Sequence, residues 1–242
     1  MRIGLISDIH GNLVALDAVL AEIDRSGVDQ IVCMGDLAVL GPQPCEVINR
    51  IMERGILTVR GNVDDWLAHG DGPSAESPTS TQTIDLTAWA FSQLEDEHIE
   101  FLRHLPLTLR LPLDDGRSMV CYHATPDSLD DITHAGKPAR VGEWSGNAWM
   151  ACGHTHIQAM WRVGDQIWLN PGSVGLPGIG PGASGLPVNR DVSWAEYAVV
   201  EIDQHGVMVT LRRIELNIEA MWSAVTATDM PHQDWWRSLW KS

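Results

Sequence analysis

Apolar runs of strand length alternate with amphipathic segments along the first sixty residues. The apolar runs lie at 2–7, 30–34 and 56–60. In the segment 13–26, Leu16, Leu20 and Ile23 recur at helical spacing and Gly27 follows as a stop signal, and residues 46–54 repeat this arrangement before Gly55. Strands that alternate with helices predict a parallel sheet with helices on its faces. Right-handed crossovers would place the carboxyl ends of these strands at one edge of the sheet.

The pattern changes to β-structure in the second half of the chain. Apolar or alternating runs, several of them joined by turn residues, predict strands at 107–113, 119–122, 148–152, 158–163, 166–169, 197–202 and 207–214. Asp114-Asp115-Gly116 is typical of a hairpin turn, and Gly164-Asp165 and Gln204-His205-Gly206 would close two further hairpins.

Helices and loops account for the remaining segments. Residues 83–104 are expected to be helical and to end at Leu105-Pro106, and shorter helices are expected near 139–144 and 234–241. Two stretches rich in Gly, Pro and small polar residues, 70–82 and 171–189, are expected to be loops. We interpret residues 1–242 as one domain with a helical insertion at about 64–106 and a Trp-rich tail at about 229–242.

Composition restricts the classes of function. With 242 residues and 44% hydrophobic content the chain can bury a sizeable core. Its net charge of −16 and the lack of a basic run argue against a long nucleic acid as a partner. A small phosphoester remains compatible, because bound divalent ions would make a site locally positive.

Sequence features also bear on location. The N-terminus starts directly with a strand-like run, so no signal peptide is expected. No apolar stretch approaches the roughly 20 residues that span a bilayer, so no membrane segment is expected. Four cysteines without a CxxC pair, three of them in apolar runs, favour reduced and mostly buried thiols. We expect a cytoplasmic protein.

Side chains that can bind metals follow the apolar runs. They are Asp8, His10, Asp36, Asn62, His123, His154 and His156. Ligands at the carboxyl ends of strands lie where open α/β sheets bind their ligands. Carboxylate, imidazole and amide groups suit divalent Mn, Fe, Co, Ni or Zn, with Mn our first expectation. Seven ligands exceed the needs of one tetrahedral ion, so we predict two divalent metal ions.

Spacing assigns roles to some of these ligands. Asp8 and His10 are two residues apart, so both would point to the same side of an extended strand end, and His154 and His156 repeat this spacing. Asp36 follows the middle strand, where one carboxylate can bridge two metals. Metals held about 3.5–4 Å apart can share an activated hydroxide and stabilise both the attacking and the leaving oxygen of a phosphoester.

Neighbouring residues fall into two groups. The first is Gly35, Gly61 and Gly153, each of which immediately precedes a ligand and would allow a tight backbone turn and close approach by a metal or substrate. The second consists of polar residues with two interpretations each: Asn12 as helix cap or substrate contact, Arg60 as phosphate contact or salt bridge, Asp64 as catalytic residue or turn cap, and Asn170 and Ser173 as site lining or turn.

The ordered motifs DxH, GD, GNxD, H and GHxH resemble the calcineurin-like metallophosphoesterase superfamily over residues 1–175. Ser7-Asp8-Ile9-His10-Gly11-Asn12-Leu13, the segment 35–42 and Asn170-Pro171-Gly172-Ser173-Val174-Gly175 are similar to its small single-domain bacterial and archaeal phosphodiesterase branch. The resemblance implies an α/β fold, a four-layer α/β/β/α sandwich of two mixed sheets. It also implies one metal on Asp8, His10, Asp36 and His156, and a second on Asp36, Asn62, His123 and His154.

One position departs from this family. Many members carry His after the Asn of GNxD, where an Asp-supported imidazole assists the leaving group, but this chain has Val63. We therefore expect a slower enzyme, or substrates with good leaving groups. His69, His98 and His134 are nearby alternatives, each of which is more often a surface histidine. Restoring the imidazole by Val63→His would test this idea.

The sequence thus predicts a dinuclear metal-dependent phosphoester hydrolase, most simply a phosphodiesterase that acts on small or nucleotide-like phosphoesters. Its proposed catalytic residues are Asp36, Asn62, Asp64 and His123, with Asn12 and Arg60 as substrate contacts. A non-catalytic metal-binding scaffold on the same fold, and a dinucleotide polyphosphate or protein phosphatase, are the alternatives. The C-terminal tail either packs on its own domain or forms a homo-oligomer contact through Trp235, Trp236 and Trp240.

Overall fold

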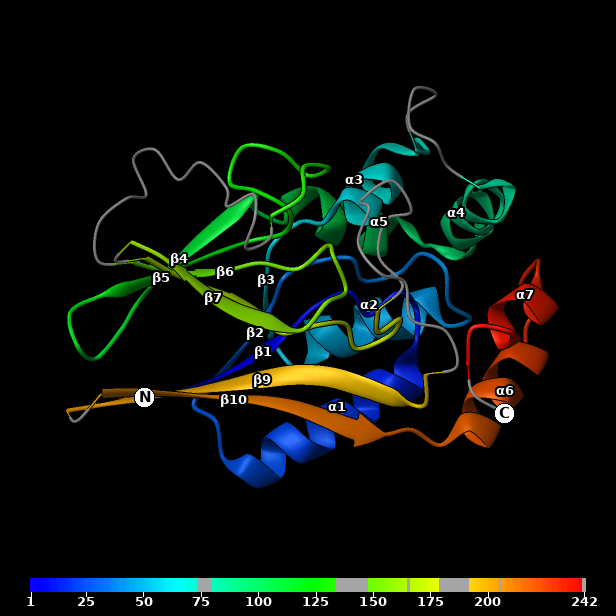
Figure 1. Ribbon diagram of the computed structural model, residues 1–242. Helices are drawn as coiled ribbons and strands as arrows, with labels where there is room; N and C mark the ends of the chain where they lie inside the picture. The colour runs from blue at the N-terminus through cyan, green and yellow to red at the C-terminus, as the bar shows by residue number, and fades with distance from the viewer. Residues whose placement is uncertain (74–79, 134–147, 165, 179–191, 205, 241–242) are drawn as a thin grey trace.

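The computed structural model describes residues 1–73, 80–133, 148–164, 166–178, 192–204 and 206–240 (Figure 1). The strands are β1 (Arg2–Ile6), β2 (Gln30–Cys33), β3 (Leu57–Thr58), β4 (Thr108–Pro112), β5 (Ser118–Tyr122), β6 (Ala148–Ala151), β7 (Ala159–Val163), β8 (Gln166–Asn170), β9 (Trp194–Asp203) and β10 (Gly206–Glu215). The helices are α1 (Leu13–Ser26), α2 (Pro44–Glu53), α3 (Asn62–His69), α4 (Thr81–Gln93), α5 (Asp96–His104), α6 (Ile218–Thr226) and α7 (Gln233–Arg237).

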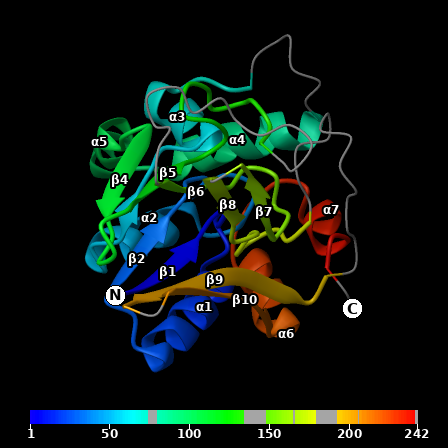
Figure 2. The same cartoon turned by 60° about the vertical axis from the view of Figure 1, so that its left-hand side comes forward.

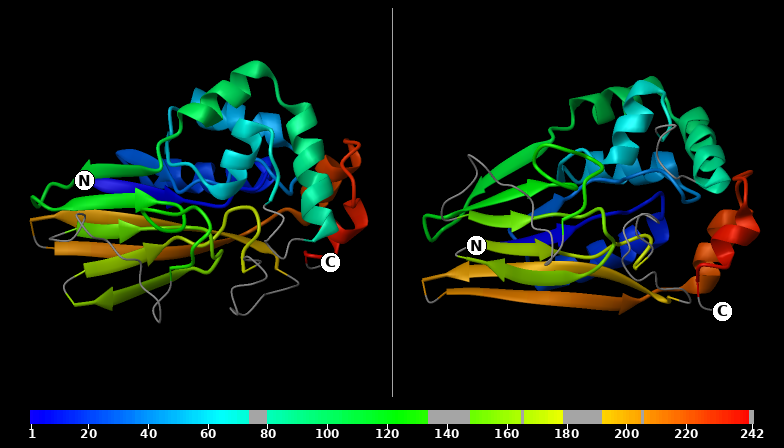
Figure 3. Two further views of the ribbon diagram at one scale, coloured as in Figure 1. Left: turned by 90° about the horizontal axis from the view of Figure 1, so that it is seen from above. Right: turned by 45° about the horizontal axis from the view of Figure 1, so that its top comes forward.

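Two five-stranded mixed sheets pack face to face (Figure 3). Sheet I has the order β10-β9-β1-β2-β3, with β1, β2 and β3 parallel and β9 and β10 antiparallel. Sheet II has the order β4-β5-β6-β8-β7, in which β5, β6 and β8 are parallel. With its flanking helices this is an α/β sandwich, as predicted. Sheet I contains the three predicted parallel strands and the predicted hairpin β9–β10. Sheet II combines the hairpins β4–β5 and β7–β8 with parallel pairing of β5, β6 and β8.

The period-two alternation of the strands divides the core into layers. Ile3, Leu5 and Val32 of sheet I meet Met119 and Cys121 of sheet II in one fully buried cluster between the sheets. The intervening residues of β5, Val120 and Tyr122, face the outer side of sheet II, where the indole Nε1 of Trp168 donates to the Tyr122 hydroxyl at 3.1 Å. A third cluster lies between sheet I and its helices. Strands such as β5 thus contribute apolar side chains to both faces of their sheet.

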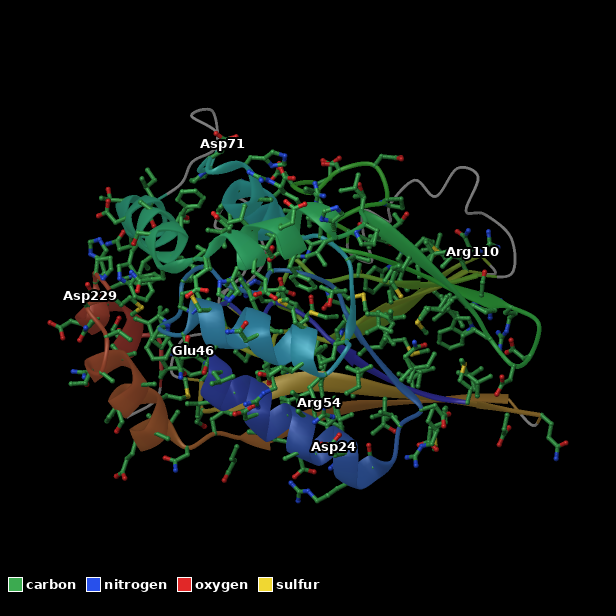
Figure 4. The ribbon with its side chains drawn as sticks, turned by 180° about the vertical axis from the view of Figure 1, so that it is seen from behind. Asp24, Glu46, Arg54, Asp71, Arg110 and Asp229 are labelled. Atoms are coloured by element: carbon green, nitrogen blue, oxygen red, sulfur yellow. The ribbon has the colours of Figure 1, made fainter. Side chains whose placement is uncertain are left out.

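Helices α1 and α2 cover the outer face of sheet I. The Asn12 side chain accepts a hydrogen bond from the Ala15 N–H and caps α1, and Gly27 ends it with φ +67°. Leu16, Val19 and Ile23 form its buried stripe. On the solvent side, the Arg54 guanidinium binds Asp24 at 2.6 Å and joins α2 to α1 (Figure 4). The capped helix fixes the loop that precedes it, which carries two of the predicted ligands.

Several segments differ from the expectation. The segment 83–104 is helical as predicted except for one break, where Leu94 and Glu95 adopt extended backbone and separate α4 from α5. The side chain of His98 accepts from the Glu95 N–H, so α5 starts with its own capping box. Helices α3 and α6 were not predicted, and β3 is shorter than the apolar run at 56–60. Helices α3, α4 and α5, which occupy the predicted insertion, gather above sheet I (Figure 2).

The C-terminal tail folds back on the chain. Trp236 and Trp240 are buried in the cluster that covers sheet I, and their rings pack 5.4 Å apart. Beside α7, the Trp89 indole donates to Asp229 at 2.8 Å, which ties α4 to the tail. Two of the three tail tryptophans are therefore buried against their own chain, and self-association through this tail stays a prediction.

Some predicted features lie outside the described residues. They are the helix near 139–144, the turn residues Asp165 and His205, and most of the loop 171–189. Among the described helices, none combines the length and apolar character needed to cross a membrane.

Candidate metal centre

The predicted ligands converge at the carboxyl edge of both sheets. Ligand atoms of Asp8, His10, Asp36 and His156 lie within 4.8 Å of one another, and those of Asp36, His123 and His154 form a second such group. Asp36 belongs to both groups, and all these side chains are buried. Asn62 extends the second group, because its Oδ1 lies 3.1 Å from His123 Nε2. Residues from five separate segments thus form two adjacent groups with one shared carboxylate.

The local backbone at five of the seven predicted ligands is left-handed, not extended. The φ angles are +55° at Asp8, +52° at His10, +60° at Asp36, +64° at His154 and +56° at His156. The expectation that Asp8 and His10 share one side of an extended strand end is therefore wrong, because the strands stop before these residues. Non-glycine residues at positive φ are uncommon and cost energy. The tight turns instead aim successive side chains into the same space.

Backbone carbonyls fix the orientation of three imidazoles. The Nδ1 atoms of His10, His123 and His156 lie 2.9, 2.6 and 2.8 Å from carbonyl oxygens. Those oxygens belong to Val39, Met34 and Leu176. Since a carbonyl only accepts, each Nδ1 carries a proton, and each Nε2 faces the cluster. His154 is reversed: its Nδ1 faces the cluster, 3.1 Å from His123 Nε2.

This arrangement requires a cation in the cluster. The Nε2 atoms of His10 and His156 face each other at 3.0 Å, although their Nδ1 atoms already carry a proton. Two lone pairs at that distance repel unless a proton or a metal ion lies between them. His123 Nε2 likewise faces the Asn62 Oδ1, which only accepts. The donor set of imidazole nitrogens and carboxylate oxygens suits first-row divalent metals.

Ionisation of the buried groups follows from their neighbours. Burial would raise the pKa of the Asp36 carboxyl, but the charge of His123 holds that pKa well below its usual range. Burial would lower the pKa of His123, but the adjacent Asp36 raises it to about 10. Burial lowers the pKa of His10 to about 4, and the charge of His156 adds to this. Burial would lower the pKa of His156 as well, but the adjacent Asp8 raises it. The cluster therefore offers ionised carboxylates, and two imidazoles whose protons a metal would displace.

The glycines before the ligands allow close packing of the loops. A Cβ atom on Gly35 would lie 2.5 Å from the Gly61 nitrogen, and one on Gly61 would lie 2.1 Å from Asp36 Oδ1. A Cβ on Gly153 would lie 2.0 Å from Ser7 Oγ. These glycines therefore let the ligand loops pack closely together, and close approach by a metal or substrate stays a prediction.

Asp64 binds backbone groups. One carboxylate oxygen accepts from the N–H groups of Asp36 and Gly61, each at 2.8 Å, and the other accepts from Leu37 at 2.8 Å. Burial raises the pKa of Asp64 to about 6. Asp64 therefore caps the turn at the start of α3 and holds the Asp36 loop against it. Val63 is 3% exposed and packs in the core cluster.

Other predicted contacts have structural partners. The Asn12 Nδ2 donates to the Gly175 carbonyl at 3.3 Å, in addition to its capping bond. Arg60 pairs with Asp65 at 3.0 Å and donates to a backbone carbonyl. Asn170 donates to the Gly153 carbonyl at 2.8 Å, and Ser173 donates to the Asp8 carbonyl at 2.7 Å. The turn and salt-bridge interpretations account for these side chains.

The alternative histidines are bound elsewhere. His98 is buried and not a surface residue as expected, with Nε2 3.1 Å from Asn49 Oδ1. His69 is exposed at the end of α3, with Nδ1 2.9 Å from the Asp65 carbonyl. His134 lies outside the described residues. Sequence reasoning could not find the carbonyls that orient the imidazoles, because a backbone acceptor has no residue signature.

Comparison with known proteins agrees with this geometry. The calcineurin-like phosphoesterase superfamily domain matches residues 1–205, and the chain belongs to that superfamily. The chain is 27% identical to protein MJ0912 of Methanocaldococcus jannaschii over 246 residues, with 95% of this chain and 93% of the relative covered. It is 27% identical to phosphodiesterase YfcE of Escherichia coli, covering 79% and 89%.

A solved structure shares the fold over nearly the whole length. The metallophosphoesterase from Sphaerobacter thermophilus superimposes with a TM-score of 0.71 at 26% identity, covering 96% of this chain and 95% of the other. Family membership makes the chain a phosphoesterase-type hydrolase with a possible metal site.

Proposed function

We propose that the chain is a phosphodiesterase that uses two divalent metal ions to cleave small phosphoesters. One ion would be held by Asp8, His10, Asp36 and His156, and the other by Asp36, Asn62, His123 and His154. The observation that carries this proposal is the pair of ligand groups that share Asp36. When bound, such ions would supply Lewis-acid stabilisation of the phosphoryl oxygens and an activated nucleophile.

The surrounding residues hold this arrangement in place. Backbone carbonyls orient His10, His123 and His156, so little reorganisation would be needed when metals bind. The buried Asp64 carboxylate fixes the loop of the shared ligand. Position 63 supplies no imidazole for the leaving group, so we expect hydrolysis rates to depend strongly on leaving-group acidity. The E. coli relative YfcE is named a phosphodiesterase, which supports a diester as substrate.

The test is hydrolysis of bis-p-nitrophenyl phosphate and p-nitrophenyl phosphate by metal-stripped protein titrated with Mn²⁺, Ni²⁺ and Zn²⁺. We expect metal-dependent turnover of the diester, lowered at least about a hundredfold in Asp36→Asn. Asp24→Asn, which removes a surface partner of Arg54, is the matched control and should keep full activity.

A dinucleotide polyphosphate tested beside these esters shows whether the chain prefers that alternative class of substrate to simple diesters. Protein that binds two metal equivalents yet hydrolyses none of these compounds would contradict the proposal and favour a binding scaffold.

A further inference from the structure

One edge of strand β10 pairs with no strand of the described residues. It is the last strand of sheet I and pairs with β9 in an unbroken register from Gly206↔Asp203 to Glu215↔Trp194 (Figure 3). No described strand pairs with its other side. None of its ten residues is buried, and Met208 and Leu211 are 57% and 38% exposed.

The hydrogen bonds of sheet I show which groups face outward. Met1 and Ile202 exchange backbone bonds at 2.8 and 2.9 Å, so alternate residues of β9 that include Ile202 pair with β1. The Leu216 N–H donates to the Ser193 carbonyl at 2.9 Å. The even-numbered residues of β10 therefore direct their N–H and C=O groups toward β9. Hydrogen-bonded pairs alternate along an antiparallel ladder. The N–H and C=O groups that face away from β9 belong to Val207, Val209, Leu211, Arg213 and Glu215.

The other sheet edges are short or blocked. Strand β3 has two residues, β7 has five, and β4 has five residues that include Pro112. Short edges and proline are features by which natural sheets avoid unwanted pairing. Strand β10 has ten residues, no proline, no lysine and no bulge in its register with β9. Among the described strands, β10 therefore has the edge best suited to pair with another strand.

We propose that β10 pairs antiparallel with β10 of a second copy of this chain and joins the two copies of sheet I. The register that uses every outward-facing residue places Leu211 opposite Leu211 of the partner at the two-fold axis. Val209 then faces the partner's Arg213, and Val207 faces the partner's Glu215. Two bonds per hydrogen-bonded pair give about ten interchain hydrogen bonds.

Charge and shape favour this register. In it no two like charges lie directly opposite, whereas a register centred on Arg213 would oppose two arginines. A register centred on Val209 would run past the end of the strand. Met208 meets the partner's Ile214, which covers an exposed apolar side chain. Strand β10 has two arginines and one glutamate, 2 − 1 = +1, so it does not add to the repulsion between copies that each carry −16.

The first test is the mass of the full chain in solution, measured by sedimentation equilibrium over a range of concentrations. We expect a dimer, with its dissociation constant raised about tenfold or more in Leu211→Pro. The proline removes an N–H that β9 does not use, so the monomer keeps its own ladder. Ile84→Ser, which removes another exposed apolar side chain from α4, should leave the dimer unchanged.

Cysteine crosslinking tests the register even if the proline variant fails to fold. In a Cys45→Ser background, in which the other native cysteines are buried, oxidised Leu211→Cys should form a disulfide-linked dimer. Met208→Cys is more exposed, but its two copies would lie about 20 Å apart and should not crosslink. A monomer at every concentration overturns the proposal. So does equal crosslinking of both variants, or a dimer that Leu211→Pro leaves intact and Leu211→Cys does not crosslink.

Discussion

Asp64 illustrates how a motif residue acts through the backbone. Its carboxylate binds the N–H groups of Asp36, Leu37 and Gly61, which belong to two loops that carry predicted ligands. A carboxylate can accept all three bonds because it has no hydrogen of its own. Asp64 is therefore a positioning residue, and its conservative amide variant separates charge and hydrogen bonding from shape.

In Asp64→Asn the amide NH₂ would face backbone donors, so at least one buried hydrogen bond is lost. We expect a loss of about 1–3 kcal/mol in the free energy of unfolding and metal affinity lowered about 10–100-fold. Urea unfolding and calorimetric metal titration measure the two effects. Asp65→Asn, which removes a partly exposed ion pair with Arg60, is the control and should change stability by less than about 1 kcal/mol. Wild-type metal affinity in Asp64→Asn would contradict the positioning role.

The proton on His123 makes metal binding pH-dependent. Its pKa is raised to about 10, so the metal-free protein holds this proton at neutral pH, whereas His10 and His154, each with a pKa of about 4, are already neutral. The neighbouring Asp8 raises the pKa of His156 as well. A metal must displace the protons of these raised imidazoles. Affinity should therefore rise with pH between 6 and 9, by about tenfold per unit for each proton displaced, and level off above the pKa of His123.

Calorimetry in buffers of different ionisation enthalpy measures the released protons. His98→Gln, which alters a buried imidazole outside the cluster, should leave the proton count unchanged. Metal binding at neutral pH without proton release would contradict the assignment.

At the scale of elements, the loops between strands and helices carry the closest contacts. Gly35 has φ +88°, and a Cβ there would lie 2.5 Å from the backbone of Gly61. Gly55 ends the segment after α2 with φ +57°, and a Cβ there would meet no atom within 4 Å. These two glycines share a left-handed backbone and differ in their surroundings, so they form a matched pair.

We expect Gly55→Ala to cost about 1 kcal/mol, because only the backbone strain changes. Gly35→Ala adds a backbone clash between two ligand loops, so it should cost several times more and weaken metal binding. Thermal unfolding and metal titration of both variants check this. Similar losses in the two variants would show that the loops can separate without penalty.

The prediction of elements succeeded where periodicity was undisturbed. The spacing of Leu16, Leu20 and Ile23 predicted α1 because one face of that helix covers sheet I. The break at Leu94 and Glu95 was missed because both flanking helices continue the apolar pattern. Helix α3 was missed because Asn62 and Asp64, read as ligand and catalytic residue, also start a helix.

At the scale of the molecule, the candidate metal centre connects the two sheets. Asp8, His10 and Asp36 follow strands of sheet I, and His123, His154 and His156 follow strands of sheet II. Metals bound to both sets would hold the sheets together, and a ligand of the folded state alone stabilises that state.

Metal removal should therefore lower the melting temperature. At a free metal concentration about 100-fold above the dissociation constant, the expected stabilisation is about 2.7 kcal/mol per site. Differential scanning calorimetry with added metal and with EDTA measures it. Asp36→Asn, which lacks the shared carboxylate, should respond much less to EDTA. Identical melting with and without metal would contradict a centre that spans both sheets.

The amino-acid sequence alone was enough to predict the candidate ligands and most of the strands that precede them. Asp8, His10, Asp36, Asn62, His123, His154 and His156 are recognisable because each follows an apolar run, and apolar runs record which backbone is buried. Tertiary structure decided how they are used. Left-handed turns, and carbonyls from distant loops, set which nitrogen of each imidazole faces the cluster. Those contacts join residues far apart in the chain through backbone atoms that all residues share, so no local pattern could reveal them.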